Sequence, residues 1–259
     1  MEAQYAICKV PVAPLRAEPS DKAEISTQLL FGEPIEVLQK TEKWWQVRNA
    51  GDGYEGWVDF KQLAPVNHEV YLRAQQDLYL VPAGYGTTVT DQNGHPYLLS
   101  PGTPLPFYKD GFCQIGEEMF KVNFEPLQVS ATMQKDIIGM AQFFQNTAYL
   151  WGGKNLFGMD CSGFTQIVFK LNGISLKRDA WQQAEQGETV DFLQEVQPGD
   201  VAFFDNEEGR ITHVGIMLNS TEIIHASGKV RIDKLDSQGI YNADLGKYTH
   251  KLRIIKRYT

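Results

Sequence analysis

The stretch from residue 149 to residue 164 constrains this chain most, because it places one cysteine between a glycine-rich loop and a helical pattern. It reads Tyr-Leu-Trp-Gly-Gly-Lys-Asn-Leu-Phe-Gly-Met-Asp-Cys-Ser-Gly-Phe. The apolar residues behind the cysteine have helical spacing, at Phe164, Ile167, Val168 and Leu171. Asp160 is a suitable N-cap, and Asn172-Gly173 is a suitable stop. The pattern predicts a helix whose first turn carries Cys161.

A cysteine at the start of a helix has the surroundings of a nucleophile. The helix dipole and the N–H groups of the first turn favour a thiolate, so a lowered pKa is expected for Cys161. A thiolate is the attacking group in cysteine hydrolases. Cys8 and Cys113 have no such context, and we expect them to be buried apolar side chains.

Two of the five histidines lie in β-like runs after the cysteine, where a base for the thiol is expected. His213 belongs to the run 211–218 and His225 to the run 222–227, and a short polar link predicts a hairpin. A three-residue loop would put both rings on one face as diagonal neighbours, roughly 7–8 Å apart. A two-residue loop would put them on opposite faces. The same-face register supplies a base and a polar orienting group, although a single strand histidine is more often structural.

Further motifs follow one another in a fixed order along the second half of the chain. They are Tyr149, Trp151-Gly152-Gly153, Asp160 to Phe164, Pro198-Gly199-Asp200, His213 to Ile216 and His225-Ala226-Ser227. This order resembles the NlpC-type family of papain-like cell-wall cysteine peptidases, over about residues 130–257.

The resemblance implies a role for each matched residue. Cys161 is the nucleophile, His213 is the base, and His225 holds the ring of His213 in the right tautomer. The backbone N–H of Cys161 faces the oxyanion, and Tyr149 adds a hydroxyl donor there. The alternative for Tyr149 is a loop aromatic packed on Trp151.

The first half of the chain has short alternating runs separated by turns, which is typical of all-β structure. Strands are expected at 35–38, 45–48 and 54–58. Residues 1–66 resemble a bacterial SH3-like barrel. Residues 67–128 are interpreted as a second, divergent SH3-like barrel, in which the run 71–81 and the run 112–122 are β-like.

From residue 129 to residue 259, helical patterns precede strand patterns. A helix is expected within 130–146 and a short helix or turn at 178–187. The expected strands are 201–204, 211–218, 222–227, 229–232 and 252–258. Helices followed by an antiparallel sheet predict an α+β, papain-like catalytic domain. The expected architecture is therefore multidomain, with two small all-β barrels ahead of that domain.

Composition and charge exclude several classes of function. The 259 residues carry a net charge of −8 without a basic cluster, so nucleic acid is not an expected partner. No apolar run approaches the ~18 residues of a membrane span. Three isolated cysteines indicate a reducing compartment, and no metal or other cofactor is expected because metal-ligand spacings are missing. A monomer is expected.

The first residues lack the basic and apolar regions of a signal peptide, which predicts a cytoplasmic protein. The alternative is export to the envelope, if the native chain carries a signal peptide that this sequence does not contain.

Family members that join SH3-like barrels to this domain cleave peptidoglycan stem peptides. The resemblance therefore implies a γ-D-glutamyl-L-diamino-acid endopeptidase, in a subgroup that takes free stems with an N-terminal L-Ala. A free ammonium needs acceptors or a carboxylate close to it. The candidate substrate-binding residues are Asp160, Ser162, Asp179, Glu33 and Tyr54.

The candidates have simpler alternatives. Asp160 is also a helix cap, Tyr54 suits a barrel surface, and Glu33 suits a solvated turn. Ala180 stands where relatives often carry a hydroxyl residue, so that contact is not carried over. Three functions follow: a recycling endopeptidase for free stems, an exported hydrolase of intact wall with the barrels as anchors, and a non-enzymatic adaptor. The adaptor predicts loss of a catalytic residue, and none is lost.

Overall fold

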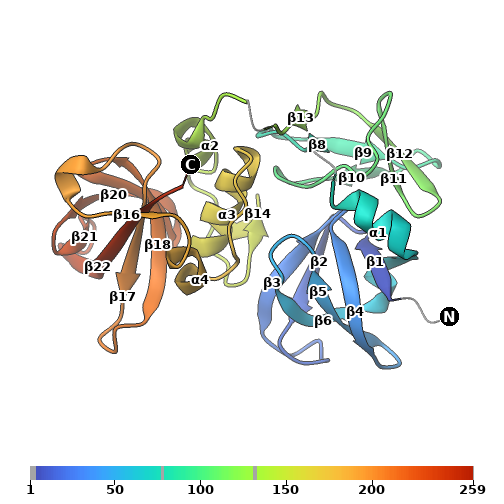
Figure 1. Ribbon diagram of the computed structural model, residues 1–259, viewed down its shortest axis with the longest axis horizontal. Coiled ribbons are helices and arrows are strands. Elements are labelled where there is room, and N and C mark those ends of the chain that lie inside the picture. Colours follow the sequence, from blue (N-terminus) through green and yellow to red (C-terminus); the bar gives the residue numbers. More distant parts are fainter. Residues whose placement is uncertain (1–3, 77–78, 131–132, 259) are drawn as a thin grey trace. The chain divides into compact units, whose positions relative to one another are not determined.

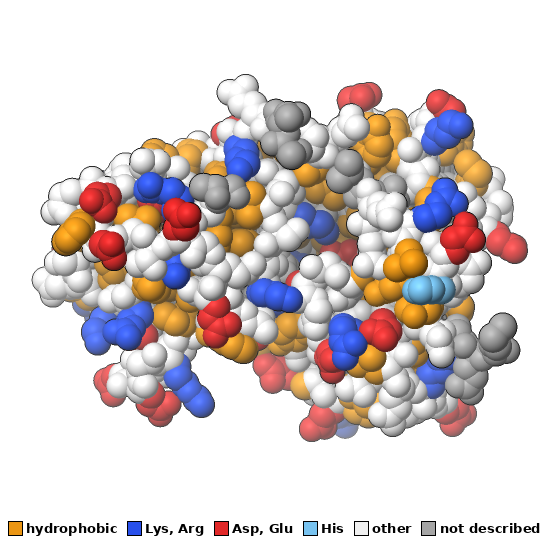
Figure 2. Space-filling view, in the orientation of Figure 1, with side chains coloured by type: hydrophobic (Ala, Val, Ile, Leu, Met, Phe, Trp, Pro, Cys, Tyr) orange, Lys and Arg blue, Asp and Glu red, His pale blue; other side chains and the backbone are white. Residues whose placement is uncertain are grey.

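The structure is a computed structural model that describes residues 4–76, 79–130 and 133–258 (Figure 1). The chain divides into two compact units, Met1–Thr132 and Met133–Thr259. Within the described ranges, no helix has the length and apolar character needed to cross a membrane. Basic and acidic side chains are interspersed over the face seen in Figure 2.

The first unit begins with a barrel-like sheet of seven antiparallel strands, in the order β3-β2-β6-β5-β4-β1-β7. The strands are β1 (Tyr5–Cys8), β2 (Val12–Arg16), β3 (Ile25–Leu30), β4 (Pro34–Lys40), β5 (Trp44–Asn49), β6 (Glu55–Asp59) and β7 (Leu63–Val66), with the 3₁₀ turn η1 (Phe60–Gln62) before β7. Strands β4, β5 and β6 confirm the three predicted from alternation. Alternate side chains form the core, which includes Cys8, Leu15, Leu29, Ile35, Val47 and Val58.

A helix and two smaller sheets follow in the same unit. They are α1 (His68–Ala74), the pair β8 (Tyr79–Leu80) and β13 (Leu127–Gln128), and a sheet of β10 (Pro96–Leu98), β9 (Thr88–Thr90), β12 (Glu118–Val122) and β11 (Phe112–Ile115). The β-like interpretation of residues 71–74 is wrong. They are helical because Asn67 caps the helix, its side chain accepting the Val70 N–H. Residues 77–78 of that run lie outside the described residues.

The segment after β7 shares a core with the first sheet. Ile7 and Phe31 of the first sheet region pack with Val81, Leu105 and Phe120 in one apolar cluster. The rings of Phe31 and Phe120 meet edge to face, with centroids 5.0 Å apart. Because of this common core, the first sheet and the segment after it belong to one compact unit.

The second unit has an antiparallel sheet in the order β16-β22-β17-β18-β19-β20-β21, and β21 also pairs with β22. Its strands are β16 (Glu188–Val190), β17 (Val201–Asp205), β18 (Ile211–Asn219), β19 (Glu222–Ser227), β20 (Lys229–Asp236), β21 (Gly239–Asn242) and β22 (Lys247–Arg257). The five predicted strands are present. Strands β16 and β21 were not predicted.

Among the described residues, three helices and a small hairpin precede this sheet in the chain. They are α2 (Ile137–Phe143), the hairpin β14 (Lys154–Asn155) and β15 (Gly158–Met159), α3 (Cys161–Leu171) and α4 (Ala180–Ala184), with the 3₁₀ turn η2 (Leu193–Glu195) after β16. Helix α3 packs against β18 and β19. Helix α2 is shorter than the predicted segment 130–146, because Asp136 caps its start and Asn146 takes a positive φ beyond its end. Residues 131–132 of that prediction lie outside the described residues.

Candidate active site

The local sequence around Cys161, the predicted nucleophile, sets where this residue lies. The Asp160 side chain accepts the Gly163 N–H at 2.6 Å, so helix α3 begins at Cys161. Gly163 has no side chain for a steric reason, since a Cβ there would collide with the carbonyl oxygen of Gly153. The glycine loop therefore lies directly against the first turn of the helix, as the motif predicts.

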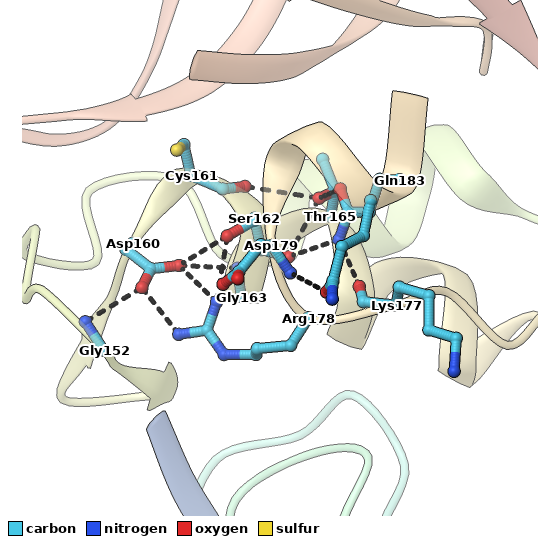
Figure 3. Close-up of polar contacts among 11 residues, drawn as sticks. Gly152, Asp160, Cys161, Ser162, Gly163, Thr165, Lys177, Arg178, Asp179 and Gln183 are labelled. Atoms are coloured by element: carbon cyan, nitrogen blue, oxygen red, sulfur yellow. Dashed lines mark hydrogen bonds and ion pairs between the residues drawn. The ribbon is translucent and has the colours of Figure 1, made fainter. Parts of the chain in front are cut away.

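The Asp160 carboxylate is also the centre of a buried polar network (Figure 3). Oδ2 accepts from Arg178 Nη2 at 2.6 Å and from the Gly152 N–H at 2.9 Å. Oδ1 accepts from Arg178 Nη1 at 3.0 Å, and that same Nη1 donates to Ser162 Oγ at 2.9 Å. Asp160 and Arg178 are 6% and 1% exposed, so the charge of each is balanced inside the protein.

The Cys161 side chain points away from this network in Figure 3. It is buried, and the backbone N–H of Val214 on β18 hydrogen-bonds to its sulfur. Burial and the Asp160 charge raise the pKa of the Cys161 thiol to about 12, against the smaller lowering by the Val214 bond and Arg178. The expectation of a lowered pKa is therefore wrong for the protein without substrate. The helix dipole acts in a site where water is largely excluded.

The hairpin of β18 and β19 brings the two histidines together. Its loop has two residues, because Asn219 pairs with Glu222, and that length alone would put the rings on opposite faces. A β-bulge at Leu218 restores the same-face register, in which Met217 pairs with Ile223 and Gly215 with His225. His213 Nε2 lies 2.7 Å from His225 Nδ1, a direct hydrogen bond.

Gly215 makes this approach of the rings possible. It lies directly opposite His225, and a Cβ at position 215 would come within 2.7 Å of the His225 Cβ. The glycine of the His-Val-Gly-Ile motif thus leaves room for the second histidine.

His213, the predicted base, is a neutral imidazole in this environment. Burial is the largest cause that lowers the pKa of His213 well below 6.5, and the neighbouring His225 and His250 lower it further. The His250 ring stacks on the His213 ring, with centroids 4.0 Å apart and planes at 25°. Burial likewise lowers the pKa of His250 to about 4, so the two stacked rings of His213 and His250 both resist protonation.

Behind the pair, β20 contributes an acidic residue. Asp233 Oδ2 lies 3.0 Å from His225 Nε2, and Asp233 Oδ1 accepts from Arg231 Nη2 at 2.8 Å. Arg231 also reaches Asp244 at 2.8 Å. A polar chain therefore runs from His213 through His225 to Asp233.

Tyr149 lines a cavity together with His213. The cavity has a volume of about 250 Å³ and is lined by Tyr149, Thr212, His213, Ala226, Ser227, Gly228 and His250. The Tyr149 N–H donates to the Gly228 carbonyl at 3.0 Å, which holds the loop before β14 to the turn between β19 and β20. Burial, together with the charges of Cys161 and Asp160, raises the pKa of Tyr149 to about 12. Its hydroxyl therefore keeps its proton at neutral pH and can donate a hydrogen bond.

Comparison with known proteins assigns this arrangement to a family. The NlpC/P60 family model matches residues 146–248, and the model of the bacterial dipeptidyl-peptidase SH3 domain matches residues 15–63. The gamma-D-glutamyl-L-lysine dipeptidyl-peptidase of Bacillus subtilis (strain 168) is 34% identical over 220 residues, which cover 78% of this chain and 72% of that protein. The chain belongs to the NlpC/P60 family of cysteine peptidases.

Other NlpC/P60 proteins support the assignment. The Bacillus cereus (strain ATCC 10987 / NRS 248) protein of the same name is 28% identical over 243 residues, 83% of this chain and 72% of that protein. A crystal structure of an NlpC/P60 family protein from Bacillus cereus ATCC 10987 has a TM-score of 0.80 at 22% identity, covering 98% of this chain and 99% of that chain. The structural match shows a shared fold.

The structure places the predicted site residues of this NlpC/P60 peptidase in two groups. The second unit holds Asp160, Cys161, Ser162, Asp179, Tyr149, His213 and His225. Asp179 is half-buried and forms a capping box at the start of α4 with Gln182. Glu33 and Tyr54 belong to the first unit. Glu33 is buried there, and its Oε2 accepts from the Leu30 N–H and from Asn49 Nδ2, so it is not the solvated turn residue considered as an alternative.

Three residues of the site were not predicted from the sequence: Arg178, Asp233 and His250. Arg178 and His250 belong to none of the motifs. Asp233 had a usable signal. If β19 and β20 turn at Gly228, His225 faces Arg231, and Asp233 is on the same face two residues further on. The predicted strand ended at residue 232, one residue too early.

Proposed function

We propose that this chain is a cysteine endopeptidase that hydrolyses the γ-D-glutamyl-L-diamino-acid bond of peptidoglycan stem peptides. The observation that carries the proposal is the His213–His225 hydrogen bond of 2.7 Å on β18 and β19, the two strands against which the helix that begins at Cys161 packs. The bond specificity is supported by the names of the Bacillus relatives.

The proposed reaction starts from a neutral thiol and a neutral imidazole. His213 takes the proton from Cys161 as the sulfur attacks the γ-carbonyl carbon of D-Glu, since the free thiol holds its proton strongly. The oxyanion accepts hydrogen bonds from the Cys161 backbone N–H and the Tyr149 hydroxyl. His213 then gives the proton to the leaving amine of the diamino acid. A water activated by His213 cleaves the thioester and returns the thiol.

We further propose that the preferred substrate is a free stem with an N-terminal L-Ala. The candidates for holding its ammonium remain Asp160, Ser162, Asp179, Glu33 and Tyr54. Asp160 is paired with Arg178, and Glu33 accepts two hydrogen bonds inside the first unit, so substituting either would also disturb the fold. The proposal is therefore tested at Tyr54. Tyr54→Ala should erode the preference for free stems and raise KM without changing thiol reactivity.

Mass spectrometry of the products tests the function and the preference together. The substrates are L-Ala-γ-D-Glu-diaminopimelate and L-Ala-γ-D-Glu-L-Lys, each with a free and with an N-acetylated L-Ala. Release of L-Ala-D-Glu from the free peptides, at a rate at least ~100-fold above the acetylated ones, is expected because unpaired buried acceptors discriminate strongly. No release of the dipeptide from either substrate would refute the function.

The proposed setting is a cytoplasmic monomer that recycles wall peptides. We also propose that residues 67–128 are a second, divergent SH3-like barrel, and that residues 129–259 form a papain-like catalytic domain. The alternative function is an exported hydrolase of intact wall. Part of this chain resembles the probable endopeptidase p60 of Listeria seeligeri, which is 40% identical over 104 residues, 40% of this chain and 20% of that protein. Efficient solubilisation of whole sacculi by the purified protein would favour that alternative.

A further inference from the structure

The buried carboxylate of Asp233 lies behind the histidine pair and has no assigned role. It is 6% exposed, and each of its oxygens has one strong partner, His225 Nε2 or Arg231 Nη2. Burial raises the pKa of Asp233, but the hydrogen bonds from His225 and Arg231 outweigh burial and lower the pKa below its usual range. Asp233 is therefore ionised at neutral pH, and an ionised carboxylate can only accept hydrogen bonds.

This acceptor decides where the protons of both rings lie. Because Asp233 only accepts, His225 must carry its proton on Nε2, 3.0 Å away. In a neutral His225, Nδ1 is then an acceptor, and His213 must carry its proton on the Nε2 that lies 2.7 Å from it. Nδ1 of His213 is the one nitrogen left with a lone pair.

We propose that Asp233 is a positioning residue for catalysis: through His225 it fixes the tautomer of His213, so that Nδ1 of His213 can accept the proton of Cys161. The inference rests on the proposed function, because it gives His213 the role of base. The same His225 tautomer serves both states of the base. A protonated His213 still donates from Nε2 to Nδ1 of His225 while its new proton is on Nδ1.

Arg231 determines how the side-chain amide would be oriented in the Asp233→Asn variant, which makes that variant a test of the tautomers. A guanidinium only donates, so in Asp233→Asn the amide oxygen must stay on the Arg231 side. The amide NH₂ then faces Nε2 of His225 and donates to it. Both rings switch tautomer, and Nδ1 of His213 becomes an N–H that cannot take the thiol proton.

The kinetic experiment uses the full chain and three variants, with L-Ala-γ-D-Glu-L-Lys as substrate. For Asp233→Asn, kcat should fall at least about 100-fold at similar KM, because a wrong histidine tautomer has dropped kcat by about 10⁴ in a related triad. Arg231→Met alone should stay close to wild type, since Asp233 keeps its acceptor role. The double variant should be more active than Asp233→Asn, because its amide is free to turn its oxygen toward His225. Asp244→Asn is the matched control, an exposed partner of the same Arg231, and should leave kcat unchanged.

Nitrogen-15 NMR of the histidine rings gives a readout that needs no turnover. The wild-type protein should show His213 and His225 protonated on Nε2, and Asp233→Asn should move both protons to Nδ1. If the wild-type protein cleaves no stem peptide but the ring protons still move from Nε2 to Nδ1 in Asp233→Asn, the proposed function is refuted. The positioning role of Asp233 then stays intact. The positioning role is overturned if the wild-type rings are protonated on Nδ1, if Asp233→Asn turns over like wild type, or if the double variant is no better than the single one. Should Asp233→Asn fail to fold, the wild-type spectrum still decides.

Discussion

The proposed nucleophile, Cys161, and the proposed base, His213, are each supported by a buried aspartate paired with an arginine, but the two pairs act on different things. Asp160 accepts hydrogen bonds from both terminal nitrogens of Arg178 and from the backbone N–H groups of Gly163 and Gly152. It therefore holds the start of α3 and the glycine loop in place. Asp233 accepts a hydrogen bond from Arg231 on one oxygen and from the His225 ring on the other. It therefore fixes which ring nitrogen of His225 carries the proton.

The difference in burial of the two arginines agrees with these roles. Arg178 is 1% exposed, whereas the Arg231 side chain is 20% exposed and shares its charge with Asp244. Removing the fully buried cation leaves an isolated buried charge, which is strongly destabilising. Removing Arg178 should therefore lower stability along with rate, whereas removing the negative charge of Asp233 should mainly lower rate.

The largest effect is expected at the reacting pair itself. Cys161→Ala and His213→Ala should each lower kcat by about 10⁴-fold or more, and the double variant should lose little beyond either, because the two residues act as a unit. Stem-peptide turnover and thermal unfolding check this together. The matched control is Cys113→Ala, a buried cysteine of the first unit, which should keep activity. Independent, additive losses at Cys161 and His213 would contradict the account.

The next effect is on stability and sharpens the comparison of the two arginines. Arg178→Met leaves the Asp160 carboxylate buried without its cation, so the free energy of unfolding of the second unit should fall by about 3–5 kcal/mol. Denaturant unfolding followed by tryptophan fluorescence measures it. Lys234→Met removes an exposed partner of Glu222 in the same unit and should leave stability unchanged. Wild-type stability in Arg178→Met would contradict the expectation that the Asp160–Arg178 pair matters more for stability than the Asp233–Arg231 pair.

Tyr149 links the two sides, and its loss should affect rate alone. Its backbone bonds to Gly228 on the base side and bridges to Met159 on the nucleophile side, and neither contact uses the hydroxyl. Tyr149→Phe should lower kcat by about 10²–10³-fold, which is typical for removing one oxyanion donor. KM and thermal stability should stay near wild type. A changed KM with an unchanged kcat would place the hydroxyl on the substrate instead of the oxyanion.

The pH dependence tests whether the resting pair is neutral. Because burial raises the pKa of Cys161 to about 12, the thiolate fraction grows with pH, and alkylation by iodoacetamide should speed up across pH 5 to 9. Peptidase activity needs an unprotonated His213, whose pKa is lowered, so the acid limb of kcat/KM should lie well below pH 6.5. An alkylation rate that is already flat at pH 6 would show a thiolate–imidazolium pair instead.

The smallest effect is expected at His250, which touches the base only through ring stacking. His250→Ala should lower kcat by up to about 10-fold, since such a stack is worth about 0.5–1.5 kcal/mol. His250→Phe keeps the stack and should retain activity. His68→Ala, in the first unit, should have no effect on kcat.

The sequence predicted the parts of this site that depend on local patterns. The start of α3 follows from the capping Asp160 and its end from Asn172, and both are confirmed. The common face of His213 and His225 is confirmed too, but for a different reason, since a two-residue loop and a bulge at Leu218 replace the expected three-residue loop. Shortening the loop by one residue would have moved one histidine to the other face, and the bulge on β18 moves it back.

What the sequence did not reveal depends on partners far apart in the chain or on burial. Arg178 and Asp160 are 18 residues apart in the sequence, and no motif spacing predicts an ion pair between them. The raised pKa of Cys161 depends on how far the sheet excludes water from the first turn of α3, whereas a capping pattern reports only the helix dipole. The run from Tyr71 was interpreted as β-like because Tyr71 and its neighbours suit a strand, but residues 71–74 are helical because Asn67 caps the helix.

Mass spectrometry of the acyl-enzyme tests most directly whether Cys161 attacks the stem peptide. The full chain is mixed with L-Ala-γ-D-Glu-L-Lys, quenched in acid within the first turnover and digested for peptide mapping. We expect the mass of an L-Ala-D-Glu acyl group on the peptide that contains Cys161, and no adduct in Cys161→Ala, which should also release no dipeptide. An acyl group on another residue, or dipeptide release by Cys161→Ala at the wild-type rate, would contradict the account.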